Sequence, residues 1–227
     1  MNNEKKQLLD KILINLRKAK NIRQSTKKDT KLFNAKIALK QFQVERLKNT
    51  HKDLLESVET KEAALFFLNE IYSFKDLSKR DADLEKLLPT MGKMFPENTL
   101  DVIANAMVLD ALTEDLEDKM ARKLGERFTE FEYEDAYRET TTYQERVLQI
   151  DLVNSLGLCL SHLVTIPLIS GTLKMMKIPA KIANLEEMHD FLNTGFHTFK
   201  NTKNPENFIN TLVSREKIIL DKIFSKK

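Results

Sequence analysis

Apolar residues recur every three or four positions along most of the chain, which is the spacing of one face of an α-helix. The longest such pattern runs from Asn98 to Leu124 without Pro or Gly, and it places Ile103, Met107, Leu116 and Met120 on one face. Because such a face has to be buried, this stretch predicts a central helix of roughly seven turns, around which the other helices are arranged.

The first quarter of the chain predicts two helices joined by a polar connection. Apolar residues from Leu8 to Leu16 form an amphipathic helix that is expected to end near Ala19 or Lys20, and the polar run 21–30 is interpreted as the connection. A second helix begins near Leu32 and extends past His51. The pattern therefore predicts an antiparallel helical hairpin.

Capping and helix-breaking residues divide the rest of the chain into further helices. Ser78 followed by Asp81 has the form of a capping box and predicts a helix from about Lys79, which Pro89 kinks or ends. By the same logic, Asn98 and Asp101 open the central helix. The other predicted helices are 64–72, a largely enclosed helix at 143–163, two short pieces within 165–185, one at 185–200, and a last one opened by Pro205.

The composition supports the same fold class. Only five Gly and five Pro occur among 227 residues, and helix-forming residues dominate. We therefore expect an all-α, bundle-like single domain of about eight to ten helices. Within it, residues 1–57 form a basic helical hairpin and residues 60–227 an acidic helical core.

Cysteine usage and hydropathy bear on the location of the protein. The single Cys159 excludes an intramolecular disulfide and suits a reducing compartment. The N-terminal residues give no uncharged apolar segment, and the most apolar region, 150–176, is interrupted by Asp151, His162 and Pro167. We expect a cytoplasmic protein without a membrane span.

Charge is distributed unevenly. Residues 1–50 contain 14 Lys and Arg against 4 Asp and Glu, a net charge of +10, and because the whole chain carries +3 the remainder carries −7. Such an arm can bind polyanions, or it can fold back on the acidic core. No aromatic side chain is interleaved with the basic cluster, so only non-specific phosphate contact is expected. The candidate phosphate contacts are Arg17, Lys18, Lys20, Arg23, Lys27, Lys28 and Lys31.

The segment FFLNEIY, from Phe66 to Tyr72, resembles the motif of a bacterial family named only for its FFLEELY motif. The likeness continues through KRDADLEKLLPTM and LDALTEDLEDKMA, so that it covers residues 66–120. Asn69 and Ile71 depart from the motif, whereas Glu70 and Tyr72 agree with it. That family has no established activity. The resemblance implies a stand-alone bacterial protein of this size and transfers no catalytic residue, cofactor or partner.

A candidate polar site is formed by residues within or beside the most apolar helices: Glu70, Tyr72, Arg80, Asp81 and Asp110. Asp110 lies between apolar pairs of the central helix, and a buried carboxylate needs a partner. Arg80, Arg138 or Arg146 could supply that partner. We expect structural pairing here in preference to catalysis.

The acidic row of the central helix also includes Glu114, Glu117 and Asp118. Asp115 with Lys119 and Asp118 with Arg122 have the i, i+4 spacing of helical ion pairs, which predicts a solvated, salt-bridged face.

Other constellations are incomplete. Glu186 and His189 form one Glu-x-x-His pair, but a di-iron bundle needs two such pairs and two further Glu residues. Cys159 and His162 are helical neighbours, yet their apolar surroundings favour an inert thiol. Phosphate-binding glycine motifs are missing. We therefore expect no metal and no cofactor.

These observations favour a non-enzymatic helical interaction or regulatory protein that binds a protein partner or self-associates. One alternative is a nucleic-acid-associated protein that uses the basic N-terminal arm. A second alternative is a small-ligand-binding or enzymatic helical protein with a polar site near Glu70, Arg80 and Asp110. A closed polar pocket with a strongly perturbed carboxylate or His would favour the second alternative.

Overall fold

A computed structural model describes the chain except Met1, residues 72–76 and 183–184, and Lys227. The described part is all helical, which confirms the predicted fold class, and it holds eleven α-helices and one π-helix. The elements are α1 (Asn3–Lys28), α2 (Thr30–Thr50), α3 (Lys52–Glu56), α4 (Lys61–Phe66), η1 (Phe67–Ile71), α5 (Ser78–Met94), α6 (Glu97–Leu124), α7 (Glu130–Thr140), α8 (Tyr143–Leu163), α9 (Pro167–Ile182), α10 (Glu186–Asn201) and α11 (Pro205–Ser225).

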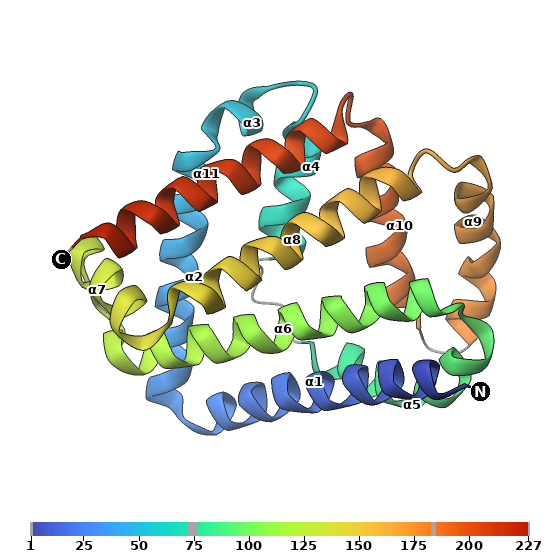
Figure 1. The fold of residues 1–227 in the computed structure, drawn as a ribbon, viewed down its shortest axis with the longest axis horizontal. Coiled ribbons are helices and arrows are strands. Elements are labelled where there is room, and N and C mark those ends of the chain that lie inside the picture. The colour runs from blue at the N-terminus through green and yellow to red at the C-terminus, as the bar shows by residue number, and fades with distance from the viewer. Residues whose placement is uncertain (1, 72–76, 183–184, 227) are drawn as a thin grey trace.

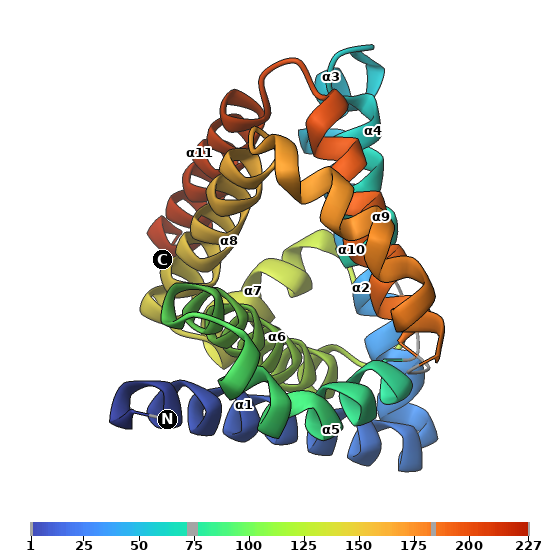
Figure 2. The ribbon, with the colours of Figure 1, turned by 90° about the vertical axis from the view of Figure 1, so that its right-hand side faces the viewer.

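Helix α6 is the long central helix that the apolar pattern predicts, and it spans the width of the molecule in Figure 1. Its Leu100, Ala104 and Met107 are buried against Ile12 and Leu16 of α1 and against α5. Helices α1 and α6 run in the same direction, since polar contacts join residues close to the start of both and residues close to the end of both. This layer is one of three sides visible in Figure 2, in which α8 with α11 forms another.

Helix α1 is longer than predicted, and the expected connection at 21–30 is wrong. The helix continues to Lys28, and Asp29 alone separates it from α2. The Asp29 side chain accepts a hydrogen bond from the Leu32 backbone N–H at 3.1 Å, so it caps α2. Two polar residues of this last part of α1 contact α6: Arg23 donates to Asp110, and the buried Thr26 donates to Asp118.

Helix α2 leaves this corner and crosses α6, so the expected antiparallel pairing along the lengths of α1 and α2 is replaced by a corner (Figure 1). Leu32, Ala35 and Leu39 pack with Met120 of α6 and with Tyr133 of α7. The helix ends at Thr50, and His51 separates it from α3, so it does not run past His51 as one helix. Helix α2 therefore connects the α6 layer to α11.

Helices α8 and α11 pack antiparallel. The Tyr143 hydroxyl donates to Asp221 at one end, and Gly157 meets Ile209 nearer the other. Helix α8 has the predicted bounds, because Thr142 and Glu145 form a capping box at its start. Its predicted enclosure is wrong: most of its side chains are half-buried, since only one side packs on α6 and α11. Phe199 and Phe208 lie in the core between α4, η1, α10 and α11.

Two further expectations are corrected. Residues 167–182 form the single helix α9 in place of two short pieces, since neither Gly171 nor Pro179 interrupts it. The predicted capping boxes do not form: Leu77 caps α5 and Pro96 caps α6 without side-chain hydrogen bonds. The Asp81 carboxylate binds arginines instead. Pro89 lies inside α5.

No single helix in the described part of the chain is both long and apolar enough to cross a membrane; α8 and α9 reach that composition only together, as a pair bent by 94°.

Replacing Gly157 by alanine should destabilise the fold, because an added Cβ would lie 2.6 Å from Cδ1 and 2.9 Å from Cγ1 of the buried Ile209. Overpacking of this kind costs roughly 1–3 kcal/mol of unfolding free energy. Gly171→Ala is the matched control, since its Cβ would meet nothing within 4 Å. Chemical denaturation should show a lower free energy of unfolding for Gly157→Ala and a slightly higher one for Gly171→Ala. Equal stabilities would contradict the close packing of α8 on α11.

Candidate functional site

The acidic row of α6 is buried where the sequence predicted a solvated face. Glu114 and Glu117 are only 6% and 3% exposed, so that prediction is wrong for them. Two flanking ion pairs are confirmed: Lys119 lies 3.1 Å from Asp115, and Arg122 lies 2.8 Å from Asp118. The sequence missed the burial because the covering cations come from α1 and α2.

Arg23 of α1 joins three carboxylates of two other helices. Its guanidinium lies 2.7 Å from Asp81 of α5, 3.1 Å from both oxygens of Asp110 and 3.2 Å from Glu114 of α6. Burial alone would lower the pKa of the guanidinium, but Asp110, Asp81 and Glu114 together raise it above its usual value. Arg23 is therefore a structural cation held between α1, α5 and α6.

The predicted polar site is brought together in part. Arg80 lies 3.0 Å from Asp81 and 2.9 Å from Asp110, which confirms Arg80 as a partner of Asp110. The other two arginines considered as partners lie elsewhere: Arg138 pairs with Asp135, and Arg146 lies on α8. Of the remaining predicted residues, Glu70 lies in η1 with its side chain outside the described residues, and Tyr72 lies outside them entirely.

Two lysines of α2 complete this buried charged cluster. Lys36 donates to Glu114, and Lys40 lies 3.1 Å from Glu117. Burial would raise the pKa of Glu114, but Lys36, Lys40 and Arg23 outweigh it and lower that pKa. Because each of these charged groups has an opposite charge beside it, the cluster fixes α1, α2, α5 and α6 against one another.

The other candidate phosphate contacts divide between α1 residues that bind the core and residues near the corner. Arg17 and Lys20 each lie 3.0 Å from Glu85, and Lys18 lies 3.5 Å from Asp115. Lys27, Lys28 and Lys31 are exposed around Asp29. Together with Arg23, at least four of the seven candidate phosphate contacts thus bind carboxylates of the same chain.

A polar cavity of about 70 Å³ lies beside the charged cluster, between α2, α6, α7, α8 and α11. It adjoins the cluster at Glu117. This volume can hold a few water molecules or a very small ligand. Its lining residues are Gln43, Arg46, Thr113, Glu117, Tyr133, Tyr137, Arg146, Gln149, Ile150, Val153, Leu212, Val213 and Glu216.

Arg146 is the unusual residue of this polar cavity, because it is 3% exposed and its hydrogen bonds within the described chain go to no carboxylate. Its Nη1 donates to Gln149 at 2.9 Å, its Nε donates to Thr141 at 3.2 Å, and its Nη2 meets the Met120 thioether, a weak acceptor. The guanidinium carbon lies 3.9 Å from the centre of the Tyr137 ring. These contacts orient the cation without neutralising it.

The opposite wall of the cavity carries a neutralised carboxylate. Arg46 donates two hydrogen bonds of 3.1 and 2.7 Å to Glu216, and His51 Nε2 lies 3.1 Å from the same carboxylate. Burial would raise the pKa of Glu216, but the His51 hydrogen bond and the Arg46 charge lower it to about 2. Burial raises the pKa of Tyr137 to about 12. Near neutral pH, Glu216 is therefore ionised and Tyr137 neutral.

Two acceptor atoms in the cavity wall have no hydrogen-bond donor within the described chain: Gln43 Oε1 and Glu117 Oε2. Glu117 still has its ion pair with Lys40, whereas Gln43 is 8% exposed and its acceptor is orphaned. Buried acceptors of this kind normally have a partner. The cavity thus combines an unneutralised cation with an unused acceptor.

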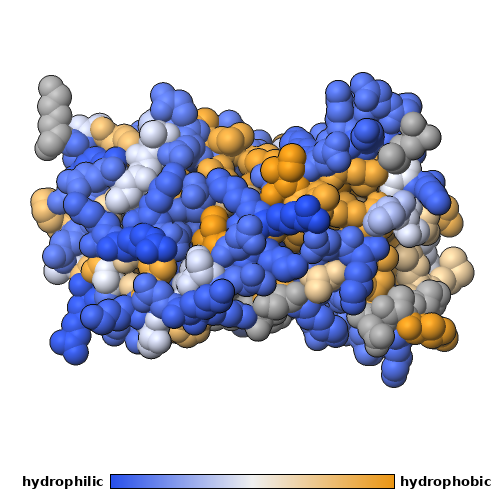
Figure 3. Space-filling model, turned by 90° about the horizontal axis from the view of Figure 1, so that it is seen from below, coloured by the Kyte–Doolittle hydropathy of each residue, from blue (hydrophilic) through white to orange (hydrophobic). Residues whose placement is uncertain are grey.

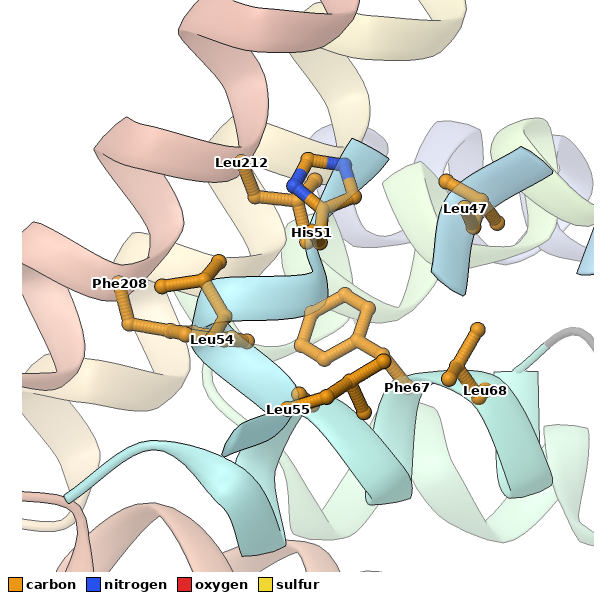
Figure 4. A pocket seen from close by; sticks show the side chains of 9 residues that line it. Leu47, His51, Leu54, Leu55, Phe67, Leu68, Phe208 and Leu212 are labelled. Carbon is orange, nitrogen blue, oxygen red and sulfur yellow. The ribbon is translucent and has the colours of Figure 1, made fainter. Parts of the chain in front are cut away.

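A second, smaller cavity of about 30 Å³ adjoins η1 and is almost entirely apolar. Figure 4 shows Phe67, Leu68 and Phe208 around it, with the His51 ring at its edge. Since a carboxylate only accepts, His51 uses the proton on Nε2 to bind Glu216, and its buried Nδ1 has no hydrogen-bond partner within the described residues. This is a packing defect under the FFLNEIY segment rather than a polar binding site.

The remaining sequence candidates are not assembled. His189 is buried with Nε2 2.8 Å from the Leu173 carbonyl oxygen, and Cys159 is a free, half-buried thiol. Searching the described residues finds no group of three His, Cys, Asp or Glu side chains that could hold a metal ion.

Gln43 and Glu216 are not among the residues predicted from the sequence, and Arg146 is predicted only as a possible partner of Asp110. The available signal was Arg146 itself, a cation in the first turns of a helix whose other side chains are apolar on several sides.

The structure defines an all-helical protein with a buried charged cluster and an adjoining polar cavity. The chain belongs to a family described as "Domain of unknown function (DUF8198)", whose model matches residues 22–227. Comparison with curated proteins and with solved structures finds no match to this chain.

Proposed function

We propose that the protein is a non-enzymatic binding protein that takes a small anionic molecule in the polar cavity at Arg146. The observation that supports this most directly is the buried guanidinium without a carboxylate partner. A buried charge is costly unless it is paired, and an anionic ligand would supply the pair. The other arginine in the wall, Arg46, already has Glu216.

The orphaned Gln43 acceptor narrows the chemistry of the ligand. A molecule that presents a carboxylate to Arg146 and a hydroxyl or amino hydrogen to Gln43 Oε1 would satisfy both groups at once. The cavity volume of about 70 Å³ restricts such a molecule to a few heavy atoms. Small hydroxy acids and amino acids meet both requirements, whereas simple carboxylates could pair with Arg146 but offer no hydrogen to Gln43.

Binding is favoured over catalysis by the protonation states of the cavity. A general base works best with a pKa near the working pH, whereas the pKa of Glu216 is about 2 and that of Tyr137 about 12. Neither group is suited to exchange a proton near pH 7. A regulatory role, in which the bound molecule tightens the contacts of α2, α8 and α11, is consistent with this site.

The test compares lactate with propionate, which differ by one hydroxyl group, in calorimetric titrations and thermal shift measurements. Lactate should bind more tightly, because only it can donate to Gln43, and each should raise Tm as its concentration passes the dissociation constant. Arg146→Gln should abolish binding of both. Arg122→Gln is the control, since Arg122 is exposed and pairs with Asp118. Absence of binding by lactate, glycine and inorganic phosphate would refute the proposal.

Gln43→Leu should separate the ligand contact from stability. Removing an acceptor that has no donor leaves the free energy of unfolding unchanged or slightly raised, since no hydrogen bond of Oε1 is lost. Lactate affinity should fall to the level of propionate, and propionate affinity should stay unchanged. Denaturation curves and titrations on the same variant measure both quantities. A destabilised variant with unchanged lactate affinity would assign Gln43 a purely structural role.

A further inference from the structure

Helix α9 exposes a continuous stripe of large apolar side chains. Leu168, Met175, Ile178 and Ile182 are 76%, 73%, 72% and 79% exposed, which is far more than a packed helix leaves open. Their spacing of seven, three and four residues, with Gly171 between them, places them on one face. Single exposed apolar residues are ordinary, but four aligned on one helix mark a contact surface.

The stripe is not used by the fold. Helix α9 packs through its other side, where Ile169 and Leu173 adjoin the core and Ala180 is buried. In both ribbon views α9 lies at the outer end of the molecule next to α10 (Figures 1 and 2). Seen from below, hydrophilic side chains cover most of the left half, whereas apolar side chains gather right of centre (Figure 3).

The charges of α9 are all of one sign. Lys174, Lys177 and Lys181 are exposed, and the helix contains no Asp or Glu. At about 100° per residue these lysines lie together along one edge of the stripe. The acidic side chains of α10 belong to the helix on which the opposite side of α9 packs. An occupant of the stripe therefore meets hydrocarbon and positive charge together.

The apolar stripe and its lysine edge together favour an anionic bilayer over a second copy of α9 as the partner of this surface. In an antiparallel pair of two copies of α9, the lysine edges would lie against each other, and like charges side by side are unfavourable. A bilayer surface with anionic lipids offers hydrocarbon to the stripe and phosphate to the lysines. We propose that α9 is a membrane-surface helix that lies in the headgroup region of anionic bilayers, with its apolar stripe inserted and Lys174, Lys177 and Lys181 at the phosphates.

The chain contains no tryptophan, so Leu168→Trp provides a single fluorescent reporter on the stripe. Leu168 is 76% exposed, and the substitution leaves the core untouched. Vesicles of phosphatidylcholine with about one third phosphatidylglycerol should shift its emission to the blue and should carry the protein down on sedimentation. Pure phosphatidylcholine vesicles should bind far less, and added salt should weaken the binding to anionic vesicles.

Two variants test the two halves of the surface. Ile178→Asp should reduce binding to anionic vesicles by about tenfold or more, because it places a charge in the inserted stripe. Replacing Lys174, Lys177 and Lys181 by glutamine should reduce it by about fivefold per lysine. Ile218→Asp, at an exposed position of α11, and glutamine at the exposed Lys61, Lys86 and Lys222 are the matched controls and should bind like the wild type.

Several outcomes would overturn the proposal. Failure of the wild type to bind anionic vesicles at low salt is one. Binding that the stripe variants and their controls change equally is another. A concentration-dependent dimer in light scattering, lost in Ile178→Asp and accompanied by no vesicle binding, would assign the stripe to a second copy of the chain. Denaturation curves of each variant are the control for folding: when they match the wild type, a loss of vesicle binding is attributable to the changed surface.

Discussion

Replacing Arg23 by leucine should lower the free energy of unfolding by roughly 3–5 kcal/mol, which is the range for breaking a buried ion pair by removing one partner. The substitution leaves Asp81 at 1% exposure with only Arg80, and it removes the ion pairs that Arg23 of α1 makes with α5 and α6. Because folded domains are stable by only about 5–15 kcal/mol, such a loss is a large part of the total. Urea denaturation measures it directly.

The pH dependence separates lost charge pairing from lost packing. In Arg23→Leu, the Glu114 carboxylate loses one of the cations that lower its pKa, so that pKa should rise and protonation should relieve part of the penalty. The difference in the free energy of unfolding between the wild type and Arg23→Leu should therefore shrink as the pH falls from 7 to 4. Arg17→Leu is the control, since Arg17 is 60% exposed and its pair with Glu85 is worth about 1 kcal/mol at most. A small or pH-independent penalty would contradict a buried charged cluster.

The second large effect is acid destabilisation through Glu216. Its pKa is about 2 in the folded chain against 4.5 as the reference value for the unfolded chain. A depressed pKa contributes stability above the unfolded value, and that contribution is lost as pH falls from about 5 through the folded value. The side chain is 16% exposed, so little solvent screening applies, and the contribution is on the order of 3 kcal/mol.

Glu216→Gln should consequently lower stability at pH 7 and flatten the stability profile between about pH 5 and pH 2. It also leaves Arg46 and His51 without their shared carboxylate. Glu45→Gln, at an exposed residue that pairs with Lys48, should keep the wild-type profile. Thermal unfolding across this pH range decides the matter; parallel profiles for Glu216→Gln and wild type would show that Glu216 is not held by Arg46 and His51.

The parts of the fold that periodicity predicted are those with an apolar face of their own. The bounds of α6 and α8 follow from uninterrupted apolar spacing, and the start of α11 follows from Pro205. The end of α1 could not be found in this way, because residues 21–28 are polar except for Ile22. Arg23 and Thr26 contact α6, about ninety residues away in the sequence, through polar groups. Periodicity registers apolar burial and is silent about buried ion pairs.

The candidate site was predictable only at one edge. The apolar neighbours of Asp110 indicated a buried carboxylate, and Arg80 was among its expected partners. Arg23, the more buried of the two cations, is a candidate for phosphate contact in the sequence, because a single sequence does not show which charges face each other. The polar cavity is lined by residues of five helices, so no local sequence spacing indicates that Gln43, Arg146 and Glu216 lie together.

The corner at Asp29 sets the angular register between the first two helices. One residue closes α1 and caps α2, and Glu114 receives Arg23 from one helix and Lys36 from the other. An inserted residue there would turn α2 by about 100° relative to α1 and carry Lys36 away from α6. The length of this connection is therefore as constrained as the charges it aligns, and relatives should tolerate substitution at the corner far more readily than insertion or deletion.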